Sequence, residues 1–103
     1  MGKAAWRLTI YIKKNDEFQG KRLHKVLLDL LAGARVSCAT VWVGVNGFGK
    51  SGKSVRYLEG IAINCPIVIE AIEEQSKLEL IMPEIKRMVD GNGLMTVTQV
   101  DIL

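Results

Sequence analysis

A glycine-rich basic segment at positions 46–56 holds the residues best suited to chemistry in this chain. From Gly47 onward it satisfies two phosphate-binding patterns, G-x-G-x-x-G and G-x-x-x-x-G-K-[ST]. Glycines let backbone N–H groups approach an anion closely, and no acidic residue lies between positions 46 and 58. The segment therefore predicts a phosphate-binding loop, whose glycines and cations are Gly47, Gly49, Lys50, Gly52, Lys53 and Arg56.

Each of the two patterns also requires a structural context. A P-loop enzyme needs a helix that begins near Lys53 and a parallel sheet, whereas positions 55–61 are short, β-leaning and stopped by Gly60. A dinucleotide-binding domain needs an acidic residue at a strand tip ~20 residues on, and Glu70 lies inside a predicted strand. A small P-loop-type nucleotide-hydrolysing enzyme and a loop without any ligand remain as alternatives.

The elements that position this loop follow from hydrophobic periodicity. Alternating apolar residues predict strands over 6–12, 40–45, 67–72 and 94–103, the last with a bulge between Val97 and Val100. Helical spacing predicts a helix from Leu23 that Gly33 ends, and a second over 73–89 that Pro83 kinks or splits. The order βαββαβ predicts an α+β, ferredoxin-like sandwich in a single domain over residues 1–103.

Right-handed crossovers place both helices on one face of the four-stranded antiparallel sheet. The other face then has no cover within the chain, although its candidate residues are too apolar to face water: Tyr11, Trp42, Val68 and Ile72. We therefore expect a homo-oligomer. Glu70 is expected to pair with Arg7 across this open face or at the seam between copies.

Composition excludes several classes of protein. The 103 residues are 49% hydrophobic and 24% charged, which argues against disorder, and the uncharged stretches are too short for a membrane helix. Two cysteines and no apolar leader favour a cytoplasmic protein. Residues 1–64 carry 11 Lys and Arg against 4 Asp and Glu, which favours an anionic ligand at one pole.

The chain resembles the nitrogen-regulatory PII superfamily, and more closely its small PII-like branch, domain of unknown function 190. Residues 45–52, Val-Asn-Gly-Phe-Gly-Lys-Ser-Gly, are similar to the Gly-Phe-Gly-Arg-Gln base of the PII T-loop. Residues 36–41 resemble the family's path into its second strand. The turn Asp90-Gly91-Asn92-Gly93 stands where PII proteins carry their Gly-Asp-Gly-Lys B-loop.

This resemblance implies a homotrimer with adenine nucleotides in clefts between subunits. The phosphates would meet one glycine turn from each of two adjacent protomers, and Thr40 would lie near the adenine. Lys50 and Ser51 replace an arginine and a glutamine, and Leu94 replaces the B-loop lysine, so ADP, AMP or cyclic AMP is as acceptable as ATP, with the role of magnesium open. The implied phosphate contacts are Gly49, Lys50, Ser51, Gly91, Asn92 and Gly93.

We expect a signalling regulator rather than an enzyme. No paired acid and base, nucleophile with histidine, or metal-ligand set is found in the sequence, and no further cofactor is required. A bound adenine nucleotide would order the loop over 46–56, which then presents a new surface to an unknown protein target. Nucleic acid is not expected as a partner because residues 66–72 are aliphatic and acidic, and no membrane insertion is expected.

Overall fold

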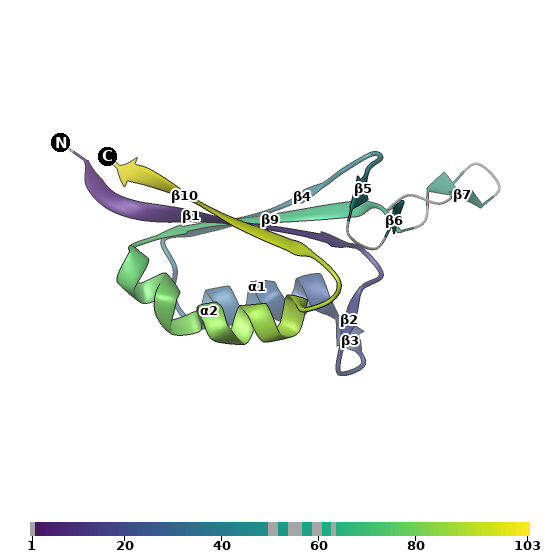
Figure 1. The fold of residues 1–103 in the computed structure, drawn as a ribbon, viewed down its shortest axis with the longest axis horizontal. Helices are drawn as coiled ribbons and strands as arrows, with labels where there is room; N and C mark the ends of the chain where they lie inside the picture. Colours follow the sequence, from purple (N-terminus) through teal and green to yellow (C-terminus); the bar gives the residue numbers. More distant parts are fainter. Residues whose placement is uncertain (1, 50–51, 54–56, 59–60, 63) are drawn as a thin grey trace.

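A computed structural model describes residues 2–49, 52–53, 57–58, 61–62 and 64–103. Its main sheet contains β1 (Lys3–Lys13), β4 (Cys38–Val43), β9 (Pro66–Glu73) and β10 (Leu94–Ile102) in the order β10-β1-β9-β4, with all neighbours antiparallel. The helices α1 (Leu23–Gly33) and α2 (Gln75–Val89) lie together on one face of this sheet, and the two termini meet at one end (Figure 1). The predicted α+β, ferredoxin-like fold is confirmed.

The core lies between the sheet and the two helices. Alternate residues of β1 point toward the helices, and Leu8, Ile10 and Ile12 are at most 4% exposed. The helices contribute apolar residues at helical spacing, which include Leu23, Leu27, Leu31, Leu78 and Ile85. The predicted apolar face of the first strand and the stripe of the first helix are therefore confirmed.

Two local predictions differ from the structure. The pairing of β10 with β1 runs without a skipped residue from Leu94 opposite Tyr11 to Ile102 opposite Lys3, so the predicted bulge is absent. The change of phase arises because β10 is an edge strand with apolar residues on both faces. The second helix continues through Pro83 as one element and is not split.

The end of α1 also differs from the expectation. Gly33 is still helical, and the left-handed conformation that terminates a helix falls on Arg35, with φ 56°. The backbone N–H of Arg35 donates to the Ala32 carbonyl, and that of Ala34 donates to the Leu30 carbonyl. The terminating turn therefore lies two residues beyond the glycine.

Short two-stranded hairpins lie outside the main sheet. The first joins β2 (Glu17–Phe18) to β3 (Lys21–Arg22). Within the glycine-rich segment, β5 (Phe48–Gly49) pairs with β6 (Gly52–Lys53), and after that segment β7 (Tyr57–Leu58) pairs with β8 (Ile61–Ala62). In the described part of the chain, neither helix has the length and apolar character needed to cross a membrane.

The face of the sheet opposite the helices, here called the open face, is uncovered as predicted. An apolar row across it joins Leu94, Tyr11, Val68 and Trp42 on neighbouring strands, and Trp42 is 57% exposed. The next row is polar and contains Thr9, Glu70 and Thr40.

The expected pair between Arg7 and Glu70 does not form within the chain. None of the ion pairs among the described residues joins these two side chains. The Nε atom of Arg7 is buried without a hydrogen-bond partner, which is costly for a polar group. Pairing at a seam between copies stays a prediction.

Candidate functional site

The glycine-rich loop and the turn after α2 meet at one end of the open face. They line a cavity of about 650 Å³, here called the loop cavity, together with the end of β1 and the start of β9. Gly47 and Gly49 lie on one side of it, and Asn92 and Gly93 on the other. Segments more than 40 positions apart in the sequence therefore converge on a single space.

Two glycines are required where these segments pack closely. A Cβ at Gly93 would collide with the carbonyl oxygen of Tyr11 and would lie 2.8 Å from Cγ2 of Ile12. A Cβ at Gly44 would lie 2.7 Å from Cγ of Pro66, and the Gly44 N–H donates to the Pro66 carbonyl over 2.8 Å. The walls of the loop cavity thus need glycine for close packing. Glycine would also let an anion approach the backbone closely.

Only some of the predicted site residues line the loop cavity. Gly47, Gly49, Asn92 and Gly93 line the loop cavity, whereas Gly91, which has φ +80°, is not part of the lining. Thr40 also lies outside the lining, on the open face opposite Glu70.

The side chains of four predicted phosphate-binding residues, three cations and one serine, are not described by the structure. Lys50, Ser51 and Arg56 fall outside the described residues, and only the backbone of Lys53, in β6, is described. Their proposed contacts with phosphate stay predictions.

The two glycine turns also come from one chain. We expected adjacent protomers to contribute them, but the antiparallel pairing of β10, β1 and β9 brings both turns to the same end of a single sheet. A neighbouring copy is therefore not needed to form this pair of walls.

Most backbone amides at the loop cavity already have partners. The N–H groups of Asn92 and Gly93 donate to the carbonyl of Val89 over 2.9 and 3.2 Å, which closes the end of α2. The Gly47 N–H donates to Oδ1 of Asn46 over 2.8 Å. In this conformation these three groups do not offer the free phosphate donors that we expected, because helix termination and a local Asn contact use them.

Charge at the loop cavity comes from a residue that the sequence analysis missed. Of the described residues that line it, Lys13 is the one charged residue. A lysine at a strand end resembles an ordinary solvated residue, and no motif marks it. The only available signal was the alternation of β1, which places Lys13 on the same face as Tyr11.

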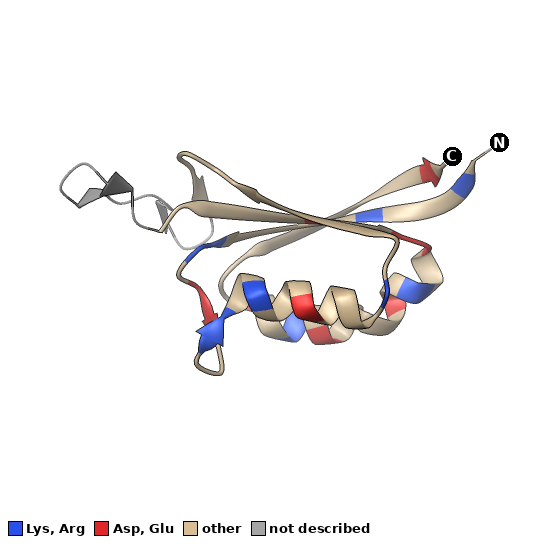
Figure 2. Ribbon diagram, turned by 180° about the vertical axis from the view of Figure 1, so that it is seen from behind, with Lys and Arg blue, Asp and Glu red and all other residues tan. Residues whose placement is uncertain are grey.

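The same end of the molecule is basic overall. Lys and Arg residues gather at the end of β1 and on the β2–β3 hairpin (Figure 2). His24, at the start of α1, has its pKa lowered by burial first and then by the positive charges of Lys25, Arg22 and Lys14. An anion is therefore the favoured ligand at this end.

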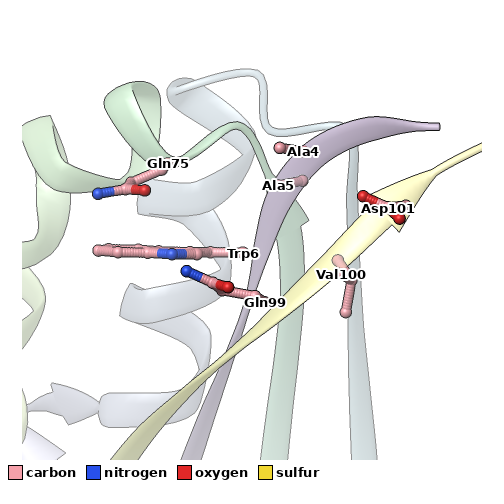
Figure 3. A pocket seen from close by; sticks show the side chains of 7 residues that line it. All are labelled: Ala4, Ala5, Trp6, Gln75, Gln99, Val100 and Asp101. Atoms are coloured by element: carbon pink, nitrogen blue, oxygen red, sulfur yellow. The ribbon is translucent and has the colours of Figure 1, made fainter.

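A second cavity, here called the terminal cavity, lies near the two termini. It measures about 450 Å³, and its lining includes Trp6, Gln75, Gln99 and Asp101. The Trp6 ring lies between the side-chain amides of Gln75 and Gln99, and the Asp101 carboxylate points from β10 nearby (Figure 3). Its one charged lining residue among those described is acidic, so it disfavours an anion.

Comparisons with known proteins agree with this architecture. The sequence profile of the DUF190 family, described as Uncharacterized ACR, COG1993, matches residues 5–102. The chain belongs to the DUF190 family. It is 30% identical over 97 residues to a UPF0166 protein of Aquifex aeolicus, which covers 93% of this chain and 90% of that protein. A UPF0166 protein of Methanocaldococcus jannaschii is 28% identical over 91 residues, with 88% and 84% covered.

The fold of this DUF190 protein is also that of PII-like proteins. CPII of Thiomonas intermedia K12, a nitrogen regulatory PII-like protein whose structure holds ADP, AMP and bicarbonate, matches with a TM-score of 0.72. The match covers 97% of this chain and 89% of CPII at 16% identity. At that identity the likeness shows a shared fold.

The DUF190 fold does not provide the context of a P-loop. The main sheet is antiparallel, and the described residues near Lys53 belong to strands β6 and β7 rather than to a helix. The sequence pattern from Gly47 to Ser54 is therefore not used as a P-loop in the described part of the segment.

Proposed function

We propose that this protein is a cytoplasmic, non-enzymatic PII-like regulator that binds an adenine nucleotide in the loop cavity. The observation that carries the proposal is the convergence of Gly47 and Gly49 with Asn92 and Gly93 around one cavity at the basic end of the fold. The fold likeness to CPII, whose structure holds ADP and AMP, supports the choice of an adenine nucleotide.

The lining suits the two parts of a nucleotide. Tyr11, Val68 and Leu94 supply an apolar wall along the open face, which suits a flat base. The glycine turns lie beside it, where small residues admit a phosphate close to the backbone. Because few amides are free, we expect binding to rearrange the glycine-rich loop, with Lys50, Ser51 and Lys53 as further phosphate contacts.

The regulatory step would use that rearrangement. A loop that adopts one conformation with nucleotide and another without it presents two different surfaces to a protein target. The nucleotide shifts the balance only to the extent that it binds one loop conformation more tightly. ADP and AMP are the first candidates, followed by ATP and cyclic AMP, each with and without magnesium.

A homotrimer built through the open face fits the same proposal. Tyr11, Val68 and Leu94 belong both to the apolar row of this face and to the loop cavity, so a neighbouring copy would close the cavity as it covers the row. Sedimentation velocity at micromolar concentration should give the mass of three chains. Trp42→Glu places a charge in the exposed row and should give monomers, whereas Leu80→Glu, at an exposed position of α2, should not.

Nucleotide binding is tested by NMR titration of the labelled protein with ADP, AMP, ATP and cyclic AMP. At least one nucleotide should shift the amide signals of Gly47, Gly49 and Gly93. The signals of Gln75, Gln99 and Asp101 at the terminal cavity serve as the internal control and should stay in place. Unchanged spectra with all four nucleotides at millimolar concentration would reject the proposal.

A further inference from the structure

We propose that Arg7 of one copy pairs with Glu70 of a neighbouring copy across the open face, and that this ion pair fixes the alignment of the copies. The inference rests on the proposed homotrimer and names the contact that sets its geometry. The occupant of the open face is thus a second copy of this chain, held by charge as well as by apolar contact.

Both charged side chains lie on the open face. Leu8 follows Arg7 in β1, Ile69 precedes Glu70 in β9, and both apolar residues are fully buried in the core beneath the helices. Alternation along each strand therefore turns Arg7 and Glu70 to the opposite side. Glu70 pairs with Thr9, two positions beyond Arg7 in β1. One chain thus presents a positive and a negative group side by side on the surface that a second copy would cover.

Neither charge has a partner within the described part of the chain. No ion pair or side-chain hydrogen bond among the described residues involves Arg7 or Glu70, and the buried Nε of Arg7 makes no hydrogen bond. The residues beside Glu70 on the two neighbouring strands are Thr9 and Thr40. They bring hydroxyl groups and no positive charge.

A second copy would make both charges need a partner. The apolar row beside them favours burial of the open face, and burial would remove water from the guanidinium and the carboxylate. A charged group that loses its water without gaining a partner strongly destabilises the contact. Because Arg7 and Glu70 have opposite signs, each copy can supply the partner that its neighbour lacks. A guanidinium also fits a carboxylate through two parallel hydrogen bonds.

The ion pair supplies an alignment that an apolar row does not. Apolar contacts allow two faces to slide, whereas a charged pair is satisfied in one register and penalises the others. In a closed ring each copy gives Arg7 to one neighbour and Glu70 to the other. The apolar row also walls the loop cavity, so the same alignment would set where the neighbouring copy meets that cavity.

Charge reversal tests the pair by sedimentation velocity and native mass spectrometry. At a micromolar concentration at which the wild type is a trimer, Arg7→Glu and Glu70→Arg should each give mainly monomers, because like charges then meet at every seam. Glu70→Gln removes the charge and nearly keeps the shape, and it should lower the association constant about thirtyfold or more. Circular dichroism checks that each separate variant is folded.

Mixing the two reversed variants shows whether the pair joins different chains. In a ring that contains both, Glu at position 7 of one copy meets Arg at position 70 of the other, and the converse pair also forms. The mixture should therefore recover trimers that contain both variants, and the double variant Arg7→Glu/Glu70→Arg should recover trimers alone. Rescue by the double variant without rescue by mixing would place the pair within one chain and overturn the proposal.

Two substitutions on α2 control for the change in net charge. Lys86→Glu and Glu79→Arg make the same changes of charge at exposed positions away from the open face, and both should remain trimers. Trimers in Arg7→Glu and Glu70→Arg would overturn the ion pair and leave the homotrimer standing. A monomeric wild type would overturn both.

Discussion

The two cavities of this protein differ in how they are built more than in how large they are. The loop cavity is walled by backbone turns, two of whose glycines cannot be replaced without collision, and its charged lining residue is Lys13. The terminal cavity is walled by side chains around Trp6, and its charged lining residue is Asp101. In each cavity, this is the one charged lining residue among those that the structure describes.

This difference shows that a hollow alone does not identify a site. The sign of the charge decides which ligand a cavity accepts, and close backbone packing decides whether its walls can be changed by mutation. By both criteria the loop cavity is the candidate for an anion. The terminal cavity is a hollow beside a tryptophan that packs against the core.

The largest effect is expected from Gly93→Ala in the wall of the loop cavity. The new Cβ would meet the backbone of Tyr11 and the side chain of Ile12, so the turn or β1 must move. We expect a loss of about 3 kcal/mol in the free energy of unfolding, at the upper end for overpacking. Urea denaturation measures it.

A helical glycine provides the control for this substitution. Gly33→Ala adds a Cβ that meets no neighbouring atom, and it should raise stability by about 0.5–1 kcal/mol. Equal effects of the two substitutions would show that the turn at Gly93 is loosely packed.

A substitution near the terminal cavity should affect stability without affecting the ligand. Glu73 is 4% exposed at the end of β9, and its carboxylate accepts from the Glu74 N–H over 2.8 Å, from Lys77 Nζ and from Ser37 Oγ. Glu73→Gln should lower the free energy of unfolding by about 2 kcal/mol, since charge-assisted bonds are lost in a buried place. ADP affinity should stay unchanged.

Acid titration gives an independent measurement of the same group. The backbone N–H of Glu74 chiefly holds the pKa of Glu73 below its usual 4.5, with further help from Lys77 and Ser37. The stabilisation is therefore complete above pH 4.5 and is lost as the pH falls through the lower, folded-state value. Glu73→Gln should flatten this acid dependence of stability more than Glu84→Gln does, because Arg87 lowers the pKa of Glu84 too but that ion pair is largely exposed to solvent.

A smaller effect is expected from His24 at the basic end. Burial and neighbouring positive charges lower the pKa of this histidine from its usual 6.5, so the unfolded chain binds the proton more readily. Stability should therefore fall slightly as the pH drops below 6.5, and His24→Gln should remove that slope. Thermal melts between pH 5 and 8 test this, and an identical slope in the variant would contradict it.

The smallest expected effect is that of Asp101→Asn in the terminal cavity. This substitution removes the carboxylate from the lining and keeps the shape of the side chain. ADP affinity, measured by calorimetry, should stay within about twofold of the wild type, because the ligand binds at the other end of the sheet. A large change would place the ligand in the wrong cavity.

Most of the fold could be predicted from local patterns in the sequence. Alternation in β1 and helical spacing in α1 are local patterns, and each reports which side of an element faces the core. The order of the elements then left the ferredoxin-like sandwich as the expected arrangement. The edge strand β10 was harder to predict. It carries apolar residues on both faces, so its sequence pattern changes phase as it would at a bulge.

The way in which the site is assembled could not be predicted from these local patterns. Glycine patterns indicated that residues 47–49 and 91–93 suit an anion, but strand pairing brought both turns to one cavity of one chain. Whether an N–H group can bind a ligand depends on whether another group, such as the Val89 carbonyl, already accepts its hydrogen bond. Whether a lysine brings charge to the site depends on whether its position lines the cavity. Such long-range contacts leave no local pattern in the sequence, and for that reason Lys13 was found only in three dimensions.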